Sequence, residues 1–375
     1  MPSASIQSRR NLQLAGERAL LVQVIYGRRT RDEAEDSLAE LERLADTAGA
    51  TVVGSITQRR ERPDPALMVG QGKLAEIQLA SRTAEANLLI FDNDLTAVQA
   101  NNLDLSMGIK VIDRTELILQ IFARRAQTAE AQIQVELAQL QYLAGRIPVS
   151  EKQQRFFGGI GMRGPGESPF QLRRAPMMAR ITILKRKLRE IQKRRQLTRR
   201  RKFGPAVCLV GYTNAGKSTL LNALSAAEAY VDDRLFATLD TKSRAVFLPD
   251  GRNAMLTDTV GFIRHLPHGL VASFRSTLEE IGQADLLLLV MDAGHRYVRE
   301  HLTVVEQTLM EIDAEDAPRL LIFNKCDTAA AQAALPQLRR DYPAALTVSA
   351  LQQDGLTDLK ARLAQMLSEQ PPAAD

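Results

Sequence analysis

The residues with the clearest chemistry run from Gly211 to Ser218 and read Gly-Tyr-Thr-Asn-Ala-Gly-Lys-Ser. They follow the apolar residues 206–210 and fit the G-x-x-x-x-G-K-[ST] phosphate-binding loop, which joins a strand to a helix. Gly211 and Gly216 are expected to let backbone N–H groups close around phosphate oxygens where a Cβ would collide. Lys217 is expected to reach the β- and γ-phosphates, and the Ser218 hydroxyl to hold Mg²⁺. The competing interpretation is a glycine-rich turn that binds nothing.

Three downstream motifs indicate that the base is guanine. Asp258-Thr-Val-Gly261 would place Asp258 just beyond the direct ligands of Mg²⁺, and the Gly261 N–H near the γ-phosphate. Asp327, in Asn324-Lys-Cys-Asp327, can accept two hydrogen bonds from N1–H and N2–H₂ of guanine, a pair that adenine lacks. Ser349-Ala350 follows a further strand and offers a backbone N–H to guanine O6. Four such motifs in order predict a GTPase rather than a generic ATPase.

A switch loop is expected at Phe236-Ala-Thr-Leu-Asp240, where Thr238 is the preferred second Mg²⁺ ligand and Thr241 its competitor. The residues expected to act directly in hydrolysis are Lys217, Thr238 and Gly261, and the expected metal ligands are Ser218 and Thr238. A second switch, which moves when the γ-phosphate is lost, is expected over residues 261–280. The whole predicted GTP-binding set is Gly211, Tyr212, Thr213, Asn214, Ala215, Gly216, Lys217, Ser218, Thr219, Phe236, Ala237, Thr238, Leu239, Asp240, Asp258, Thr259, Val260, Gly261, Asn324, Lys325, Asp327, Ser349 and Ala350.

Phe262 stands where signalling GTPases carry a water-orienting glutamine. A phenyl ring cannot position water, so hydrolysis is expected to be slow until another residue or a partner assists it. Such help is worth roughly 10³–10⁵ in rate for an arginine finger. The alternative is that Phe262 only packs under the loop, while a loop residue or a bound potassium ion stabilises the charge.

Strands and helices alternate through the C-terminal half, which predicts a mostly parallel, doubly wound α/β sheet with its ligands at the carboxyl ends of the strands. The expected strands are residues 207–210, 245–248, 255–258, 286–291, 320–324 and 346–348. The expected helices are residues 217–226, 272–282, 300–312, 329–342 and 356–367. The predicted fold is therefore an α/β P-loop GTPase domain over residues 203–367, with a tail at 368–375.

A smaller α/β domain is predicted over residues 19–113, after a flexible tail at 1–18. Its expected strands are residues 19–26, 51–56, 87–91 and 110–113. Leu38, Leu41, Ala45 and Ala48 share one helical face between the first two strands. Val69-Gly-Gln-Gly-Lys73 resembles a nucleotide loop, but it lacks the full spacing and the final Ser/Thr. We therefore expect a structural turn that opens a helix, with a nucleotide site as the alternative.

A long antiparallel helical hairpin is predicted over residues 114–202. One long helix is expected from Phe122 to Ala144, and a second around residues 181–191, with apolar residues recurring at steps of three and four. Residues 156–167 hold five glycines and a proline, which favours a flexible tip or a disordered linker.

The second helix concentrates the positive charge. Residues 185–202 contain eleven Lys or Arg and one acidic residue, in a chain whose net charge is only +5. Such a local basic helix is typical of contacts with a phosphate backbone, here structured RNA read by shape, since no aromatic interrupts the run. A solvated face and an acidic membrane surface are the alternatives. The predicted RNA-binding residues are Lys185, Arg186, Lys187, Arg189, Lys193, Arg194, Arg195, Arg199, Arg200, Arg201 and Lys202.

The composition of the 375-residue chain suits a cytoplasmic protein with two or three domains. Hydrophobic residues make up 45%, and the two cysteines, Cys208 and Cys326, suggest neither a disulfide nor a metal site. No apolar run is long enough for a membrane span and no signal peptide is recognised, so no membrane insertion is expected. Nothing in the sequence demands more than a monomer.

Taken together, the motifs resemble the HflX GTPases over roughly residues 20–367. Besides the loops above, the resemblance rests on Gly261-Phe-Ile-Arg-His-Leu-Pro267, Phe274-Arg-Ser-Thr-Leu-Glu-Glu280, Gln134-Val-Glu-Leu-Ala-Gln-Leu-Gln-Tyr-Leu143, Gly158-Gly-Ile-Gly161, Arg163-Gly-Pro-Gly-Glu167 and Val69-Gly-Gln-Gly-Lys73. It implies a GTPase that binds the large ribosomal subunit and, in its GTP form, splits stalled ribosomes under stress, with Mg²⁺ as cofactor. Some members of the family are also reported to bind ATP and remodel RNA.

One segment departs from the family pattern. After Glu167 the family usually continues Thr-Gln-Leu-Glu-x-Asp-Arg-Arg, whereas this chain reads Ser168-Pro-Phe-Gln-Leu-Arg-Arg-Ala175. This change affects the hairpin and leaves the nucleotide motifs intact. Two other functions stay open: an RNA-remodelling ATPase with a regulatory GTP site, and a GTPase switch with a protein partner.

Overall fold

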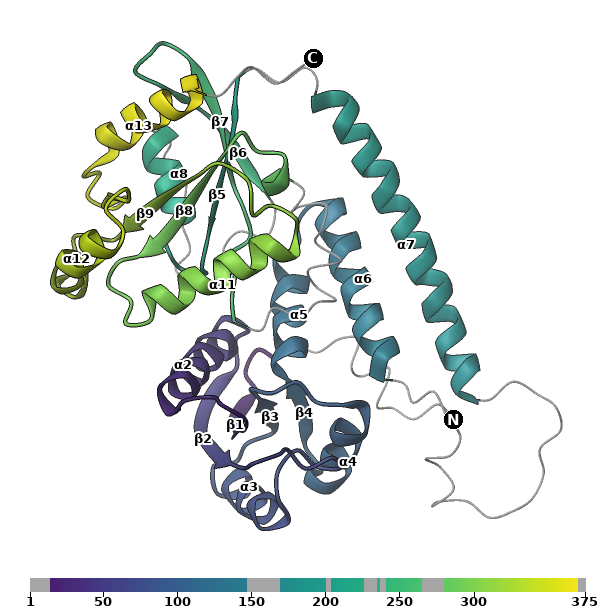
Figure 1. Ribbon diagram of the computed structural model, residues 1–375. Helices are drawn as coiled ribbons and strands as arrows, with labels where there is room; N and C mark the ends of the chain where they lie inside the picture. Colours follow the sequence, from purple (N-terminus) through teal and green to yellow (C-terminus); the bar gives the residue numbers. More distant parts are fainter. Residues whose placement is uncertain are drawn as a thin grey trace. The chain divides into compact units, whose positions relative to one another are not determined.

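The computed structural model describes residues 14–146, 169–199, 204–225, 235–236, 241–264 and 280–369. Contacts between residues divide the chain into two units, which are described separately (Figure 1). The first comprises residues 1–124 and 133–187, and the second residues 125–132 and 188–375.

The first unit contains a parallel four-stranded sheet with strand order β2-β1-β3-β4. Its strands are β1 (Arg18–Ile25), β2 (Thr51–Arg59), β3 (Leu88–Phe91) and β4 (Lys110–Asp113). The four strands predicted from the sequence are confirmed within a few residues at each end. The predicted tail over residues 1–18 is too long, because Leu14 is 1% exposed and the Gly16 N–H donates to the Gly49 carbonyl. Residues 1–13 lie outside the described part of the chain.

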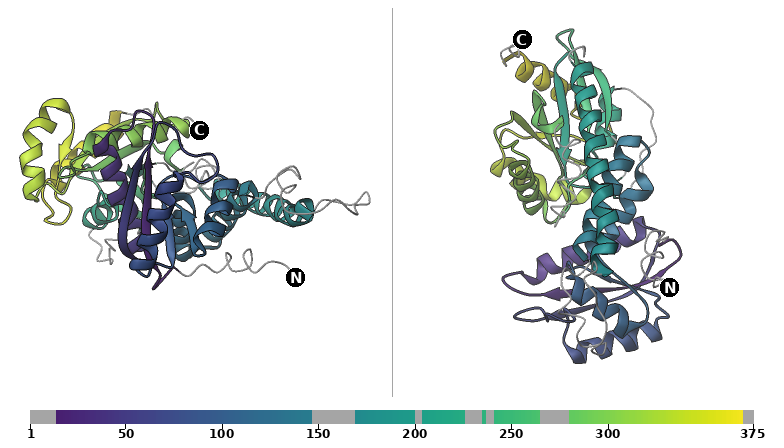
Figure 2. Two further views of the ribbon diagram at one scale, coloured as in Figure 1. Left: turned by 90° about the horizontal axis from the view of Figure 1, so that it is seen from below. Right: turned by 90° about the vertical axis from the view of Figure 1, so that its right-hand side faces the viewer.

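Helices cover both faces of this sheet (Figure 2). Leu20, Val22 and Val24 of β1 face α3 (Gln71–Thr83) and α4 (Ala97–Met107), whose buried leucines and alanines complete the core. Gln23 points to the opposite face, where its side chain donates to the Ala34 carbonyl of α2 (Arg31–Thr47). The alternation of neighbouring side chains along β1 therefore supplies both layers, as expected for a strand buried on two sides.

The single helix predicted from Phe122 to Ala144 is wrong. The chain forms two helices, α5 (Arg114–Arg125) and α6 (Ala129–Arg146). Thr128 separates the two helices because it caps the start of α6: its hydroxyl accepts a hydrogen bond from the Ala131 N–H at 3.2 Å, as an N-cap does. The apolar spacing stays in phase across the break, so periodicity alone could not detect it.

The long helix α7 (Pro169–Arg199) carries the basic segment. In the first unit it lies beside α6, and the two run in opposite directions (Figures 1 and 2). Arg180 of α7 makes two hydrogen bonds to the Glu136 carboxylate of α6, at 2.7 and 2.8 Å. Ile181, Leu184 and Leu188 are buried on the apolar side of α7. The predicted glycine-rich tip, residues 156–167, lies outside the described residues.

The second unit contains a six-stranded sheet with strand order β10-β9-β8-β5-β7-β6. Its strands are β5 (Ala206–Gly211), β6 (Lys242–Phe247), β7 (Asn253–Asp258), β8 (Leu286–Asp292), β9 (Arg319–Asn324) and β10 (Leu346–Thr347). Only β6 is antiparallel among these strands. All six were predicted, and the near-continuous apolar runs of the central strands β5 and β8 reflect burial on both faces.

In the described part of this unit, two helices cover each face of the sheet, which makes it doubly wound. The helices α8 (Lys217–Ser225) and α13 (Leu356–Glu369) share one core with Val207, Leu209 and Leu288. The helices α11 (Val298–Glu311) and α12 (Ala329–Asp341) share the other with Cys208, Val210 and Leu289. Most of the helix predicted over residues 272–282 lies outside the described residues. Among the helices that are described, none is both long and apolar enough to cross a membrane.

Candidate functional site

The phosphate-binding loop leaves the carboxyl end of β5 and runs into α8, as predicted. Gly216 has a φ of +87°, a conformation that favours glycine, and a Cβ there would lie 2.4 Å from the Asn324 side-chain nitrogen. At Gly211 the steric demand comes from the sheet, because a Cβ would lie 2.1 Å from the Val290 carbonyl of β8. The expectation that phosphate alone requires Gly211 is therefore incomplete: close approach of two strands requires it already.

Lys217 is folded back onto the loop from the first turn of α8. Its ammonium donates to the carbonyls of Gly211 and Tyr212, at 3.1 and 3.0 Å, and its residue is only 6% exposed. Burial lowers the pKa of the Lys217 ammonium to about 8, and the negative charge of Asp258 opposes part of that shift. A buried cation whose partners are neutral carbonyls is suited to exchange them for phosphate oxygens, which offer charge-assisted hydrogen bonds.

Ser218, an expected metal ligand, contacts Asp258, which is expected just beyond the direct ligands. The Ser218 hydroxyl donates to Asp258 Oδ2 at 2.5 Å, and Asp258 is fully buried at the end of β7. The neighbouring Thr259 hydroxyl donates to the Leu209 carbonyl, which fastens this strand end to β5. Hydroxyl and carboxylate oxygens this close at the mouth of a phosphate loop fit a hard divalent cation such as Mg²⁺.

The segment that begins at Gly261 lies directly on the phosphate loop. The Thr213 N–H donates to the Phe262 carbonyl at 2.8 Å, and the Phe262 N–H donates to the Gly211 carbonyl at 3.0 Å. A Cβ at Gly261 would lie 3.0 Å from Lys217 Nζ. The γ-phosphate sensor expected at Gly261 is thus next to the lysine expected to bind the same phosphate.

Phe262 itself belongs to the hydrophobic core. Its side chain is 1% exposed and packs with Val210, Leu289 and other residues of the α11 side of the sheet. This supports the alternative that Phe262 packs under the loop. A buried ring offers no group to orient an attacking water, so that task falls to another part of the chain or to a partner.

The guanine-binding motifs meet at the carboxyl ends of β9 and β10. The Asp327 carboxylate is exposed and accepts a hydrogen bond from the Ser349 hydroxyl at 2.6 Å. The Ala350 N–H, expected to meet guanine O6, donates to Asn324 Oδ1 at 3.0 Å. Lys325 has a φ of +61° and its ammonium lies 2.8 Å from Asp292 Oδ2. The sequence analysis missed Asp292, and its place at the end of β8 was the available signal.

Several of the predicted site residues lie outside the part of the chain that the structure describes. Ala237, Thr238, Leu239 and Asp240 lie outside the described residues, so the second metal ligand stays a prediction. Phe236 is described, with a φ of +55° and a buried side chain. Tyr212 is part of the loop, but its side chain stacks on His301 of α11, so only its backbone belongs to the phosphate-facing surface.

The basic face of α7 is exposed where its side chains are described. Lys185, Arg186, Lys187, Arg189 and Lys193 are all exposed, while Leu184 and Leu188 between them are buried. Arg194, Arg195 and Arg199 lie on the helix, but their side chains are outside the description, as are Arg200, Arg201 and Lys202 altogether. The five described cations therefore form an exposed surface outside the core.

The Val69–Lys73 motif opens a helix, as expected. Gly70 is the residue before α3, and its N–H donates to the side chain of Gln58 at 3.1 Å. A Cβ at Gly70 would lie 2.4 Å from Arg60 Nη1, so glycine here admits a neighbouring guanidinium. These contacts explain the glycine by local packing. They do not indicate a second nucleotide-binding loop.

Strand-end phosphate, metal and guanine motifs on one doubly wound sheet define the class: this is a P-loop GTPase. Three family models match the chain, described as "GTP-binding GTPase N-terminal" (residues 35–123), "GTP-binding GTPase Middle Region" (residues 125–202) and "50S ribosome-binding GTPase" (residues 206–325). The GTPase HflX of Caldanaerobacter subterraneus subsp. tengcongensis is 48% identical over 83% of this chain and 73% of its own. The chain belongs to the HflX GTPase family, and it is an enzyme that hydrolyses GTP.

Two further relatives and one solved structure agree. The GTPase HflX of Alkalihalophilus pseudofirmus is 45% identical over 90% of this chain and 80% of its own. That of Escherichia coli K12 is 45% identical over 84% of this chain and 74% of its own. The crystal structure of SsGBP in complex with GDP covers 94% of this chain and 99% of its own, with a TM-score of 0.52 and 25% identity.

Proposed function

We propose that the protein associates with the large ribosomal subunit in its GTP-bound form, and that the ribosome stimulates hydrolysis and thereby releases it. The observation that carries the proposal is the exposed basic surface of α7. The five cations whose side chains are described, Lys185, Arg186, Lys187, Arg189 and Lys193, are exposed, and residues 185–202 hold a single acidic residue in sequence. Concentrated cations of this kind suit a phosphate backbone. The family description of residues 206–325 as a 50S ribosome-binding GTPase supports the same partner.

The buried side chain of Phe262 supports the dependence on a partner. The position that orients water in signalling GTPases holds a core residue here. A group contributed by the ribosome, or an ordered switch loop, would supply the missing stabilisation. A bound potassium ion is the remaining alternative.

Mg²⁺ is the proposed cofactor of the site. Ser218 would hold the ion directly, with Thr238 as the second hydroxyl ligand, and Asp258, which accepts the Ser218 hydrogen bond, would lie just beyond the direct ligands. The ion would supply charge neutralisation between the β- and γ-phosphates. The chain's own residues bind and orient the nucleotide: Lys217 on the phosphates, Gly261 beside them and Asp327 on the base.

Steady-state GTP hydrolysis with and without salt-washed large ribosomal subunits tests the proposal. We expect strong stimulation that saturates with subunits and is absent in the Lys217→Ala variant. A rate that stays unchanged at saturating subunits, while GTP still binds, would refute ribosome stimulation and favour a regulatory switch with a different partner.

The role of α7 has its own test. Lys185, Arg189 and Lys193 are spaced by four residues and so lie along one face of the helix. Replacing all three with glutamine is expected to weaken subunit binding and to reduce the slope of log affinity against log salt by about one per lost phosphate contact. The matched control replaces Arg319, Arg339 and Arg340, exposed cations of the GTPase domain, with glutamine. If both triple variants weaken subunit binding equally, the effect reflects the net charge of the protein and not a specific role of α7.

Dissociation of stalled ribosomes and residence in the cytoplasm complete the proposal. Splitting is checked by light scattering of purified 70S ribosomes after addition of the protein with GTP or with a non-hydrolysable analogue. Binding without loss of scattering would restrict the function to association.

A further inference from the structure

Tyr212 holds a position that the nucleotide chemistry does not account for. It follows Gly211 directly, and its backbone forms an isolated parallel bridge with Phe262. Its side chain is 4% exposed and turns into the protein instead of toward the phosphate-facing surface. A large aromatic residue with a polar tip, placed inside the phosphate loop, needs a partner for both parts.

The hydroxyl of Tyr212 forms a hydrogen bond with the segment expected to begin the second switch. It accepts the backbone N–H of Arg264 at 2.9 Å, in a buried environment. Arg264 lies three residues beyond Gly261. The short segment from Gly261 to Arg264 is therefore fastened twice to the phosphate loop, once through the backbone of Phe262 and once through the Tyr212 hydroxyl.

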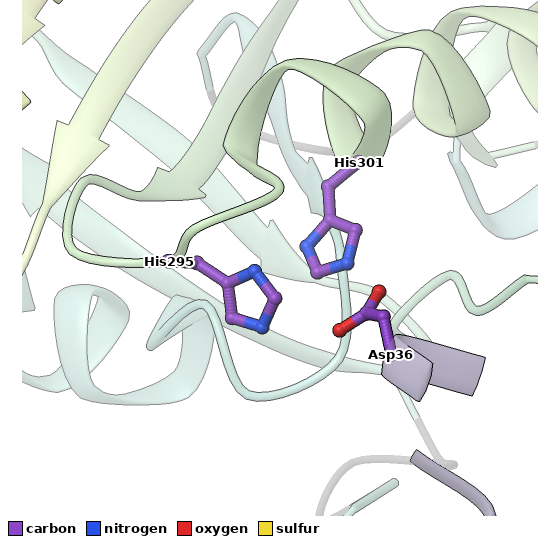
Figure 3. A group of neighbouring side chains, drawn as sticks. All are labelled: Asp36, His295 and His301. Carbon is purple, nitrogen blue, oxygen red and sulfur yellow. The ribbon is translucent and has the colours of Figure 1, made fainter. Parts of the chain in front are cut away.

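The ring of Tyr212 finds its partner on α11. It stacks on the imidazole of His301 with ring centroids 3.6 Å apart and planes within 2° of parallel. His301 is buried and in turn contacts His295, whose ring centroid is 4.2 Å away, on the loop that leaves β8 (Figure 3). The packing of Tyr212 on His301, which itself contacts His295, holds the tyrosine ring in place. The hydroxyl therefore has little freedom to follow a moving switch.

The fastened segment borders the reacting phosphate. A Cβ at Gly261 would lie 3.0 Å from Lys217 Nζ and 2.8 Å from the Thr213 Cα. Displacement of this segment by even a fraction of an ångström changes the space between the Gly261 N–H and the lysine. Hydrolysis depends on such placement more steeply than binding does, because stabilisation in the transition state requires groups that are already in position.

We propose that Tyr212 is a positioning residue for GTP hydrolysis. Its hydroxyl fixes the distance between the Gly261–Arg264 segment and the phosphate loop. The stack on His301 in turn fixes the position of the hydroxyl. The residue acts on the rate of the chemical step and leaves nucleotide affinity nearly unchanged, since its side chain faces away from the phosphates.

The Tyr212→Phe variant tests this in the full-length protein, because it keeps the ring and removes the acceptor. We expect kcat for GTP to fall about tenfold, in line with the loss of one well-placed hydrogen bond, while KM for GTP and the Kd for a fluorescent GDP analogue change less than about twofold. Exchange of the Arg264 amide hydrogen, measured by mass spectrometry, is expected to accelerate. Tyr342→Phe removes a phenol hydroxyl on the same domain, away from the loop, and serves as the matched control.

The stack is tested separately at His301. His301→Leu is expected to lower kcat as Tyr212→Phe does, and His301→Phe, which keeps a flat ring, to restore most of it. A wild-type kcat in Tyr212→Phe would overturn the proposal. So would a fall in nucleotide affinity that parallels the fall in kcat, because that pattern indicates a generally disturbed loop. Retained GDP binding shows that each variant is folded.

Discussion

The side-chain nitrogen of Asn324 donates a hydrogen bond to the backbone carbonyl of Ala215 at 2.9 Å, while its oxygen accepts the Ala350 N–H at 3.0 Å. Asn324 is 1% exposed, so both bonds lie in a low-dielectric environment. One side chain thus joins the phosphate loop to the loop that is expected to face guanine O6. The asparagine of the guanine motif serves the architecture of the site as much as the base.

Replacement of Asn324 with aspartate is therefore expected to lower both stability and GTP affinity, since it removes the donor and places a carboxylate next to the Ala215 carbonyl. We expect the free energy of unfolding to fall by about 1–3 kcal/mol and GTP affinity to drop about tenfold or more. Denaturant titration and nucleotide titration measure the two effects. Asn253→Asp, an identical change at an exposed position of β7, is the control and should alter neither.

GTP affinity should depend on pH through Lys217. Because burial lowers the pKa of Lys217 to about 8 in the nucleotide-free protein, this ammonium loses its proton above that pH, whereas bound phosphate requires the charged form. Affinity is expected to be constant below the pKa and to fall about tenfold by about one pH unit above it. Titration of a fluorescent GTP analogue from about pH 6.5 to about pH 9.5 measures the profile. Lys217→Ala should bind weakly and lose this dependence, and a flat profile in the unmodified protein would contradict the assignment.

Base specificity should follow Asp327. Exchange of its carboxylate for the carboxamide of asparagine replaces an acceptor by a donor at one of the two bonds to guanine. We expect GTP affinity to fall about 100-fold, the loss of about 3 kcal/mol of charge-assisted hydrogen bonding, and affinity for xanthosine triphosphate, which carries a carbonyl at C2, to rise. Competition titration with the two nucleotides measures the ratio. Asp354→Asn, an exposed neighbour on the same side, should leave the preference for guanine intact, and its failure to do so would point to net charge.

Stability of the first unit should depend on Arg146. Its guanidinium is bonded to the Asp113 carboxylate, lies 3.3 Å from that of Glu116, and stacks over the ring of Tyr142, all in a largely buried cluster. Truncation to leucine leaves two buried carboxylates without their cation, which is expected to cost about 3–5 kcal/mol of unfolding free energy. Hydrogen exchange of α6, together with denaturant unfolding, reports the loss.

Arg180 provides the contrast for that experiment. It also joins a helix of the hairpin to a carboxylate, that of Glu136, but the pair is exposed to solvent. Water and salt screen such a pair, so Arg180→Leu should change stability little. Similar losses in the two variants would mean that burial does not govern these contacts.

The GTPase domain could be predicted from sequence almost element by element, for a physical reason. Its central parallel strands are largely buried and so read as short apolar runs, and the motifs directly follow such runs. The strand Arg319–Asn324, for example, is followed immediately by the guanine motif. Local sequence and global position coincide there, which is why Asp258 and Asn324 end their strands as the sequence indicates, while their roles at the nucleotide stay predictions.

The features that escaped prediction depend on packing across long sequence separations. The stack of Tyr212 on His301 joins residues that only the fold brings together, and no spacing rule encodes it. The break before α6 escaped for the opposite reason, because a single threonine cap interrupts an apolar pattern that continues unchanged on either side. The core position of Phe262 could be stated only as an alternative, since a phenylalanine beside a loop is compatible with either a buried or a mobile ring.

The crowding at Gly211 has a practical consequence for genetics. Because the Val290 carbonyl occupies the space of any Cβ at this position, a substitution there would damage the sheet whether or not nucleotide is present. An inactive allele made at Gly211 would mix misfolding with loss of turnover, and its phenotype could not be assigned to either. Lys217, whose ammonium donates to the Gly211 and Tyr212 carbonyls and does not occupy this crowded position, offers the cleaner null allele for dissecting the protein in cells.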